Sequence, residues 1–358
     1  MNNLIKNKKI IRIAEKNIRT DNQGYLWGKS ISESNILNKK EKSGYKDISC
    51  VAERWICSDD RKYPCFFVTD NNKKHSLPEL FEKYSEEIFS KEHLKKYGAY
   101  LGTIMKLIDT NSVPSKGSLS LQTHPCAGYP DLPVKPEMWL SLTQGSKVFI
   151  GWKKDYTEKD ILDAIENNSI FDMLNEVEFD LNKKLLVYGG AIHAIRYGSF
   201  IAEWSKSPIK KDKGTLEQAS VALADNTDGK EPREGKVNKE LAIDILKNCN
   251  GLKKTDIDDV MPDGKVLYKD EKGNSIIKIF ENSDIIVEEI HIVDFVKVEN
   301  KGIVSSMFLY KGDIEVNYND YNDKFEESSE IISPAYIDEF QITNKSSNPV
   351  SVFRWYNV

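Results

Sequence analysis

At residues 119–125 the chain reads Leu-Ser-Leu-Gln-Thr-His-Pro, with Ser120, Gln122 and His124 at every second position. Residues two apart in an extended strand point to the same face. We therefore expect these three side chains to project together from one strand. A Q-x-H pair on its own is more often a strand with polar residues than a metal site, so its meaning depends on the residues around it.

Two further polar groups strengthen the case for a metal site. At residues 135–139 the chain reads Lys-Pro-Glu-Met-Trp, which places Lys135 and Glu137 on one face. The buried run at residues 185–188 leads through Gly189-Gly190 to His193, which we expect at the end of that strand. Two imidazoles, one carboxylate and one amide oxygen can form an N2O2 site for zinc, and also for iron or manganese.

The region from about residue 260 predicts an all-β unit. Turn signals at 263–264 and 272–274 bracket short alternating strands. Further β segments are expected over 285–298, 303–310, 331–342 and 350–356. Many short strands at regular spacing are typical of a sandwich or jelly roll.

Apolar residues at helical spacing predict three helical segments among these strands, over 77–98, 157–175 and 238–248. Short strands are expected before residue 70 and over 103–152. The predicted fold class is therefore mainly β with added helical segments.

The composition is that of an ordinary globular protein. The chain has 358 residues, 51 of them basic and 56 acidic, and the resulting net charge of −5 disfavours a dedicated nucleic-acid binder. No stretch approaches the ~20 apolar residues that a membrane helix needs. The basic start lacks the apolar core of a signal peptide. We expect a cytoplasmic protein with neither nucleic acid nor membrane as a partner.

The number and spacing of the cysteines also favour the cytoplasm. There are five of them, an odd number, and no C-x-x-C occurs. Neither a disulfide framework nor a zinc ribbon is indicated by that pattern. We therefore expect free thiols at Cys50, Cys57, Cys65, Cys126 and Cys249.

The order of the motifs (Q-x-H, then K-x-E, then G-x-x-H-A) resembles that of the type I phosphomannose isomerases, which are mannose-6-phosphate isomerases. These are zinc enzymes of the cupin superfamily. The resemblance covers most of the chain and includes blocks similar to the family's at residues 52–58, 106–109, 200–203, 229–234 and 241–242.

The resemblance implies two cupin jelly rolls, with one zinc ion per chain bound in the first. It implies that the zinc ligands are Gln122, His124, Glu137 and His193. The expected division is a metal-binding cupin with helical insertions over 1–207, a small helical linker over 208–258, and a second cupin over 259–358. The second cupin has no His/Glu set of its own, so we expect it to be degenerate in metal binding.

The activity that the resemblance implies is isomerisation of mannose 6-phosphate and fructose 6-phosphate through a cis-enediol. That reaction needs a base for a carbon-bound proton and a cation for the developing enediolate oxygen. Lys135 and Glu203 are the candidate catalytic residues, and Ser120 and Lys135 the candidate substrate-binding residues. The alternatives are a solvated strand residue for Lys135 and a structural carboxylate for Glu203.

One departure from the family pattern concerns a catalytic arginine, which in the family acts on the substrate. If Asp225 matches the family's aspartate near that arginine, the arginine position falls on Ala222. No arginine occurs between Arg196 and Arg233. Arg196 is one possible substitute, and the others are a cluster of lysines, Lys206, Lys210, Lys211 and Lys213.

This departure keeps a second function open. The alternative is a non-catalytic or weakly active zinc cupin that binds a sugar or a sugar phosphate. A metal-dependent cupin oxygenase is a weaker option, because such enzymes commonly use histidines and one carboxylate rather than a glutamine.

Overall fold

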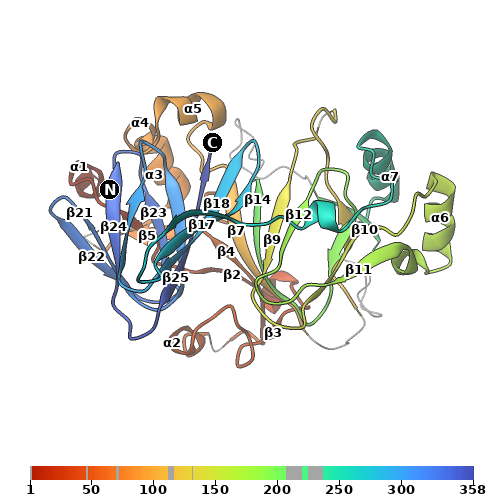
Figure 1. Ribbon diagram of the computed structural model, residues 1–358, viewed down its shortest axis with the longest axis horizontal. Helices are drawn as coiled ribbons and strands as arrows, with labels where there is room; N and C mark the ends of the chain where they lie inside the picture. The colour runs from red at the N-terminus through yellow and green to blue at the C-terminus, as the bar shows by residue number, and fades with distance from the viewer. Residues whose placement is uncertain are drawn as a thin grey trace.

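The computed structural model describes residues 2–45, 47–69, 72–111, 117–130, 132–206, 220–224 and 237–358. Within them the chain is mainly β, as predicted, and its strands form two jelly rolls side by side (Figure 1). None of the helices in these ranges is long and apolar enough to cross a membrane.

The first jelly roll consists of two antiparallel sheets. One has the order β11 (Leu174–Glu178), β10 (Lys147–Trp152), β13 (His193–Ile195), β8 (Leu121–Thr123) and β15 (Val221–Ala224). The other has the order β12 (Lys184–Val187), β9 (Glu137–Ser141), β14 (Phe200–Lys206), β7 (Thr103–Asp109), β4 (Cys50–Ile56) and β2 (Asn17–Thr20), with β3 (Lys29–Ser30) also paired to β4. Buried side chains such as Trp139, Ile150 and Ile201 fill the space between the sheets.

The second jelly roll is built in the same way. Its larger sheet has the order β1 (Ile11–Arg12), β23 (Glu330–Ser333), β20 (Ser305–Lys311), β25 (Val350–Asn357), β18 (Ile285–Ile292), β17 (Ser275–Glu281) and β16 (Lys265–Lys269). The smaller has the order β19 (Phe295–Glu299), β24 (Glu339–Asn344), β21 (Ile314–Tyr318) and β22 (Tyr321–Phe325). Strand β1 comes from the start of the chain, so the two ends of the chain share one sheet. The predicted division near residues 207 and 259 stays a prediction.

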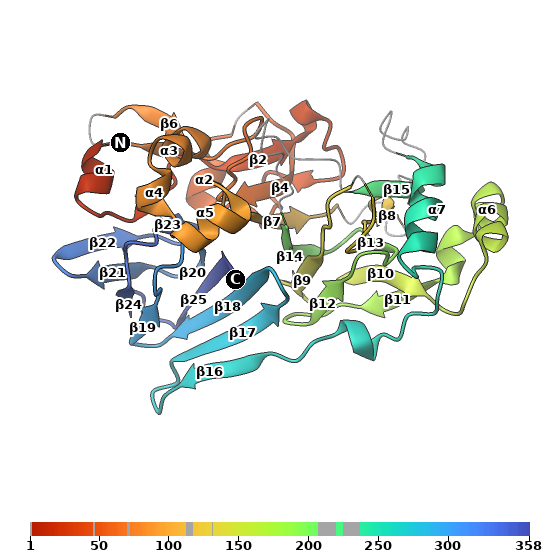
Figure 2. The same ribbon diagram turned by 90° about the horizontal axis from the view of Figure 1, so that it is seen from above.

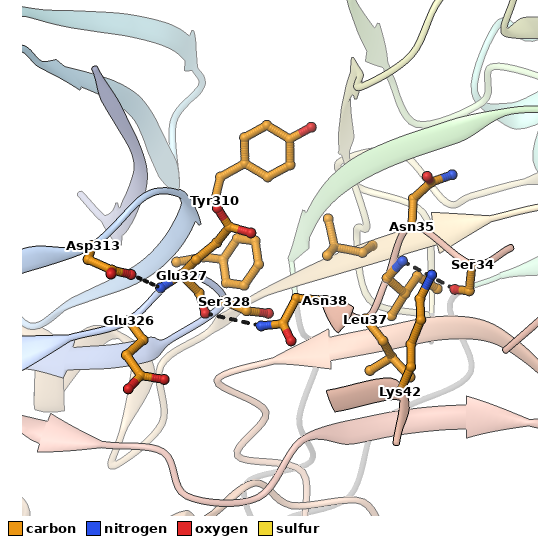
Figure 3. Close-up of a pocket in the computed structure, with 13 residues that line it drawn as sticks. Ser34, Asn35, Leu37, Asn38, Lys42, Tyr310, Asp313, Glu326, Glu327 and Ser328 are labelled. Atoms are coloured by element: carbon orange, nitrogen blue, oxygen red, sulfur yellow. Dashed lines mark hydrogen bonds between the residues drawn. The ribbon is translucent and has the colours of Figure 1, made fainter. Parts of the chain in front are cut away.

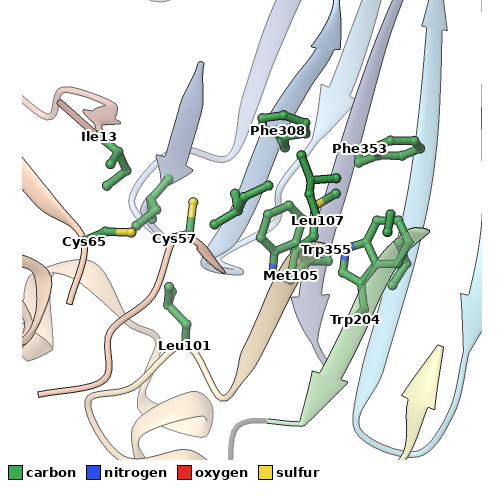
Figure 4. Close-up of a cluster of buried hydrophobic side chains, with 14 of the residues drawn as sticks. Ile13, Cys57, Cys65, Leu101, Met105, Leu107, Trp204, Phe308, Phe353 and Trp355 are labelled. Carbon is green, nitrogen blue, oxygen red and sulfur yellow. The ribbon is translucent and has the colours of Figure 1, made fainter. Parts of the chain in front are cut away.

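A shared core joins the two jelly rolls. Met105 and Leu107 on β7 and Trp204 on β14 turn away from the interior of the first jelly roll and meet Phe353 and Trp355 on β25 (Figure 4). The rings of Trp204 and Phe353 lie edge to face at 5.3 Å. Because this cluster is continuous and buried, the sheets of the two units pack as one body.

Several helices lie over one half of the molecule, and two others lie at its opposite end (Figure 2). The single helical segment predicted over 77–98 consists of three short helices in the structure: α3 (Leu77–Lys83), α4 (Ser85–Ile88) and α5 (Lys91–Tyr97). The chain breaks where Tyr84 and Phe89 leave the helical conformation, and Ser90 caps the next helix. Also in this half are α1 (Asn2–Lys6), α2 (Lys39–Lys42) and the hairpin of β5 (Phe66–Val68) and β6 (Lys74–Ser76), while the turn η1 (Asp21–Gln23) connects β2 and β3 of the first jelly roll.

At the other end lie α6 (Glu158–Glu166) and α7 (Lys239–Asn248). The helical pair predicted over 157–175 corresponds to α6 and a short helical turn, η2 (Ile170–Met173), and it ends where strand β11 begins at Leu174. The segment over 238–248 is confirmed as α7. A last short turn, η3 (Asp258–Val260), precedes the second jelly roll.

The prediction of free thiols is wrong for two of the five cysteines. Cys126 and Cys249 form a disulfide with a Cα–Cα distance of 5.6 Å, while Cys50, Cys57 and Cys65 are not disulfide-bonded. The partners are 123 residues apart, and the packing of α7 against β8 and β15 brings them together. Spacing along the chain therefore carried no sign of the pair.

Candidate metal centre

The predicted metal ligands meet between the two sheets of the first jelly roll. Glu137 begins β9 in one sheet, and His193 begins β13 in the other. Gln122 on β8 pairs directly with His193, and His124 follows the end of β8. The expectation that His193 ends a strand is wrong: β12 stops at Val187, and His193 opens a new strand after a glycine turn.

Three of these side chains converge closely. The Nε2 atom of His124 lies 3.0 Å from Oε1 of Glu137, and Nε2 of His193 lies 3.7 Å from Oε2. One ligand atom from each residue lies within 4.8 Å of the others, and all three residues are buried. Two imidazole nitrogens and a carboxylate at this spacing fit a divalent metal such as zinc.

His193 is fixed in the form that a metal ligand requires. Its Nδ1 lies 3.0 Å from the carbonyl oxygen of Ala191. Because a carbonyl can only accept, Nδ1 carries the proton and Nε2 keeps a lone pair that faces Glu137. Burial, with help from His124, lowers the pKa of His193 to about 3, so the ring is neutral at pH 7.

Glu137 is held as a carboxylate. Burial by itself raises its pKa, but Lys135 and His124 outweigh burial and hold the pKa well below the ordinary range. The indole Nε1 of Trp139 donates to Oε2 of Glu137 at 3.2 Å. Its ring also meets His193 edge to face at 5.4 Å, so one side chain supports two candidate ligands.

Gln122 and Ser120 contact each other. Nε2 of Gln122 donates to Oγ of Ser120 at 2.6 Å, and in this orientation Oε1 is the amide atom able to bind a metal. Ser120 is buried. Its predicted contact with substrate stays a prediction.

Lys135 belongs to the same cluster. Its Nζ contacts Oε1 of Glu137 directly and lies 3.1 Å from Oγ of Ser220. The side chain is only 12% exposed. A lysine ammonium therefore lies beside the candidate metal ligands.

A second lysine that sequence reasoning did not single out lies near this cluster. Nζ of Lys106 on β7 is 2.7 Å from Oε1 of Glu203 on β14, and Ser205 Oγ lies 3.3 Å from the same oxygen. Burial opposes the charge of Lys106, but Glu203 and Glu53 outweigh it and raise the pKa. The sequence did contain a signal for Lys106, because this charged residue stands inside the apolar run Ile-Met-Lys-Leu-Ile at 104–108.

The structure describes Ala222, the residue at the position expected for the family's arginine. Ala222 on β15 pairs with Gln122 on β8 and is buried, so its methyl group faces the same side of the sheet as the glutamine. Asp225, which set this alignment, lies outside the described residues, as do Arg233 and the lysines Lys210, Lys211 and Lys213.

Arg196 and Lys206 are the two candidate substitutes for the family's arginine that the structure describes, and both bind other residues. Arg196 binds Glu176 and lies over the ring of Phe149, on the face of the sheet opposite to His193. Lys206 lies 3.2 Å from Asp284 of the second jelly roll.

A separate cleft of about 610 Å³ opens between the segment around 34–42 and residues 308–328 (Figure 3). Leu107 lines it, and Leu107 points to the face of β7 opposite to Lys106. The cleft therefore lies outside the metal centre.

No family model and no curated protein matches this sequence. Solved structures do match. Mannose 6-phosphate isomerase from Bacillus subtilis gives a TM-score of 0.70 at 16% identity, covering 97% of this chain and 99% of that one. A point mutant of phosphomannose isomerase from Salmonella typhimurium gives 0.68 at 13% identity, with coverage of 97% and 99%.

A zinc-bound mannose 6-phosphate isomerase gives a TM-score of 0.67 at 12% identity, again covering 97% of this chain and 99% of that one. At such low identity these matches establish the fold. Over nearly its whole length, the chain has the two-jelly-roll cupin fold of the mannose-6-phosphate isomerases.

Proposed function

We propose that this protein is a zinc-dependent isomerase that interconverts mannose 6-phosphate and fructose 6-phosphate. The buried group of His124, Glu137 and His193 carries the proposal, because it unites a metal donor set with the lysine Lys135. The fold shared with mannose-6-phosphate isomerases supports the choice of substrate.

Four residues would hold the zinc: Gln122, His124, Glu137 and His193. When bound, the zinc supplies a Lewis acid that stabilises negative charge on a sugar oxygen. The protein contributes a water-poor site in which the tautomer of His193 and the charge of Glu137 are already set. Such preorganisation lowers the cost of building charge in the transition state.

Lys135 is assigned the proton transfer between C1 and C2. The base must accept a proton from one carbon and return it to the other, so a single amine beside both carbons can perform both steps. The contact of Lys135 with Glu137 already holds this amine beside the candidate zinc ligands.

Lys106 and Glu203 are assigned a different role. Because the pKa of Lys106 is raised, it stays a cation and suits an anionic group of the substrate. Glu203 is occupied by Lys106 and Ser205. We therefore assign Glu203 to positioning Lys106 rather than to accepting a proton from carbon.

A coupled isomerase assay on zinc-loaded protein tests this function, with a panel of hexose and pentose phosphates as substrates. We expect turnover to be highest with mannose 6-phosphate and fructose 6-phosphate. Stoichiometric zinc together with no turnover of any sugar phosphate would contradict the proposal.

One observation favours the weakly active alternative: an alanine methyl group lies across from Gln122. Loss of one preorganised cation costs ~10²–10³ in rate, or about 3–4 kcal/mol. On this alternative, calorimetry detects sugar-phosphate binding while turnover stays far below the ~1–10³ per second of metabolic enzymes. Ala222→Arg should then raise turnover.

A further inference from the structure

We infer that the disulfide between Cys126 and Cys249 positions the two histidines of the metal centre, so that its reduction weakens zinc binding. The inference deepens the proposed function and rests on the zinc site proposed there. It adds a redox dependence and two positioning residues to that site.

The disulfide lies directly beside one metal ligand. Cys126 follows His124 by two residues, where the chain leaves β8, and Cys249 immediately follows α7. The backbone N–H of Cys126 also donates to Sγ of Cys249 at 3.1 Å. The bond therefore fastens the end of α7 to the loop that carries His124.

A glycine turn fits against both cysteines. A Cβ added to Gly189 would lie 2.4 Å from Cα of Cys126, and one added to Gly190 would lie 2.6 Å from Cβ of Cys249. The N–H of Gly190 donates to the carbonyl oxygen of His124 at 2.7 Å. The disulfide, the glycine turn and His124 thus form one close-packed unit.

The same turn controls His193. Ala191, next to Gly190, provides the carbonyl that accepts from Nδ1 of His193 and so directs Nε2 towards Glu137. If the turn moves, that hydrogen bond changes and the ring loses its fixed orientation. Partners that orient a metal-bound histidine commonly change metal affinity by about 10–100-fold when removed.

Reduction should act on these loops without removing the helix. Apolar residues of α7, including Ala242, Ile245 and Leu246, pack with Leu121 and Val221 in a buried cluster that does not depend on the disulfide. Both cysteines are half-buried, so a small reductant can reach them. A dithiol donor would supply two electrons and two protons, converting the S–S bond into two thiols while forming its own disulfide.

Zinc release provides the test. The full chain is loaded with zinc in its oxidised form, and release to a chromophoric chelator is timed before and after treatment with a trialkylphosphine, which takes oxygen from water to become the phosphine oxide. Thiol counts should rise from three to five as the disulfide opens. We expect zinc release to become at least about tenfold faster.

Two variants sharpen the result. Cys249→Ser should release zinc as fast as the reduced wild type and should not respond to the phosphine. Cys50→Ser, which changes a half-buried cysteine outside the disulfide, should behave as the wild type does. If Cys249→Ser does not fold, the wild-type comparison before and after reduction still decides the question.

Equal or slower zinc release after full reduction would overturn the inference, as would five free thiols in the oxidised protein. If the oxidised wild type holds no zinc, the inference and the proposed function both fail. If zinc binds and depends on the disulfide but no sugar phosphate is isomerised, the inference stands and the proposed function alone fails.

Discussion

At the scale of single residues, Lys135 connects the metal centre to the chemistry, because its ammonium contacts Glu137 and Ser220. Lys135→Ala should abolish turnover while zinc stays bound, since all four candidate zinc ligands remain. Lys147→Ala, which removes a more exposed lysine paired with Glu176, is the matched control. Elemental analysis and the isomerase assay check both effects, and a Lys135→Ala variant with normal turnover would refute the assignment.

His193 should be indispensable for metal binding. His193→Ala removes a nitrogen whose direction is set by the Ala191 carbonyl, so we expect purified protein to lose most of its zinc. His291→Ala, in β18 of the second jelly roll, should keep one ion per chain. Full zinc occupancy in His193→Ala would show that the metal, if present, lies elsewhere.

The buried carboxyl group of Asp59 should make the free energy of unfolding depend on pH. It is buried, accepts from the N–H of Leu101 at 2.6 Å, and burial raises its pKa to about 7. Between the ordinary aspartate pKa near 4 and pH 7, the folded state binds more protons than the unfolded state, so stability falls as pH rises through this window. Asp59→Asn should flatten the fall in melting temperature between pH 5 and 8, whereas the exposed Asp320→Asn should leave it unchanged.

At the scale of elements, the sequence predicted local strand geometry better than long-range connections. Alternation along residues 119–125 predicted one strand carrying Ser120, Gln122 and His124, and β8 (Leu121–Thr123) includes Gln122, with the other two residues directly beside its ends. The pairing of Cys126 with Cys249 depends on where α7 packs, which no local pattern records. The break at Tyr84 was missed for a related reason: the apolar spacing continues through it, while the backbone does not.

The glycine turn before β13 gives a prediction about one element. Gly190 has a φ angle of +86° and Gly198 a φ angle of +88°. Substitution of either glycine by alanine should therefore lower the free energy of unfolding by about 1 kcal/mol through backbone strain. Only at Gly190 would the new methyl group collide with Cys249; at Gly198 nothing lies within 4 Å. Gly190→Ala should therefore lose zinc and melt at a lower temperature than Gly198→Ala, and equal behaviour of the two variants would contradict this account.

At the scale of the whole molecule, a buried ion pair joins the two jelly rolls. Nε and Nη2 of Arg54 on β4 lie 2.9 and 2.8 Å from Oε1 of Glu330 on β23, and neither residue is exposed. Glu330 also accepts from the N–H of Cys57 at 2.9 Å. With the aromatic cluster around Trp204, this pair predicts that both units unfold in one cooperative transition, which calorimetry can check.

Removing the charge of Arg54 alone should lower the free energy of unfolding more than removing the charges of Arg54 and Glu330 together. Arg54→Met leaves the carboxylate of Glu330 buried without its cation, at a cost of about 3–5 kcal/mol, whereas Arg54→Met with Glu330→Met removes the unpaired charge and should recover part of the loss. Denaturant unfolding measures the difference, and a double variant less stable than the single one would contradict it. Arg54 faces the second jelly roll while its neighbour Glu53 turns to the opposite face of β4. Because the zinc ligands lie on other strands, both variants should still bind zinc wherever they remain folded.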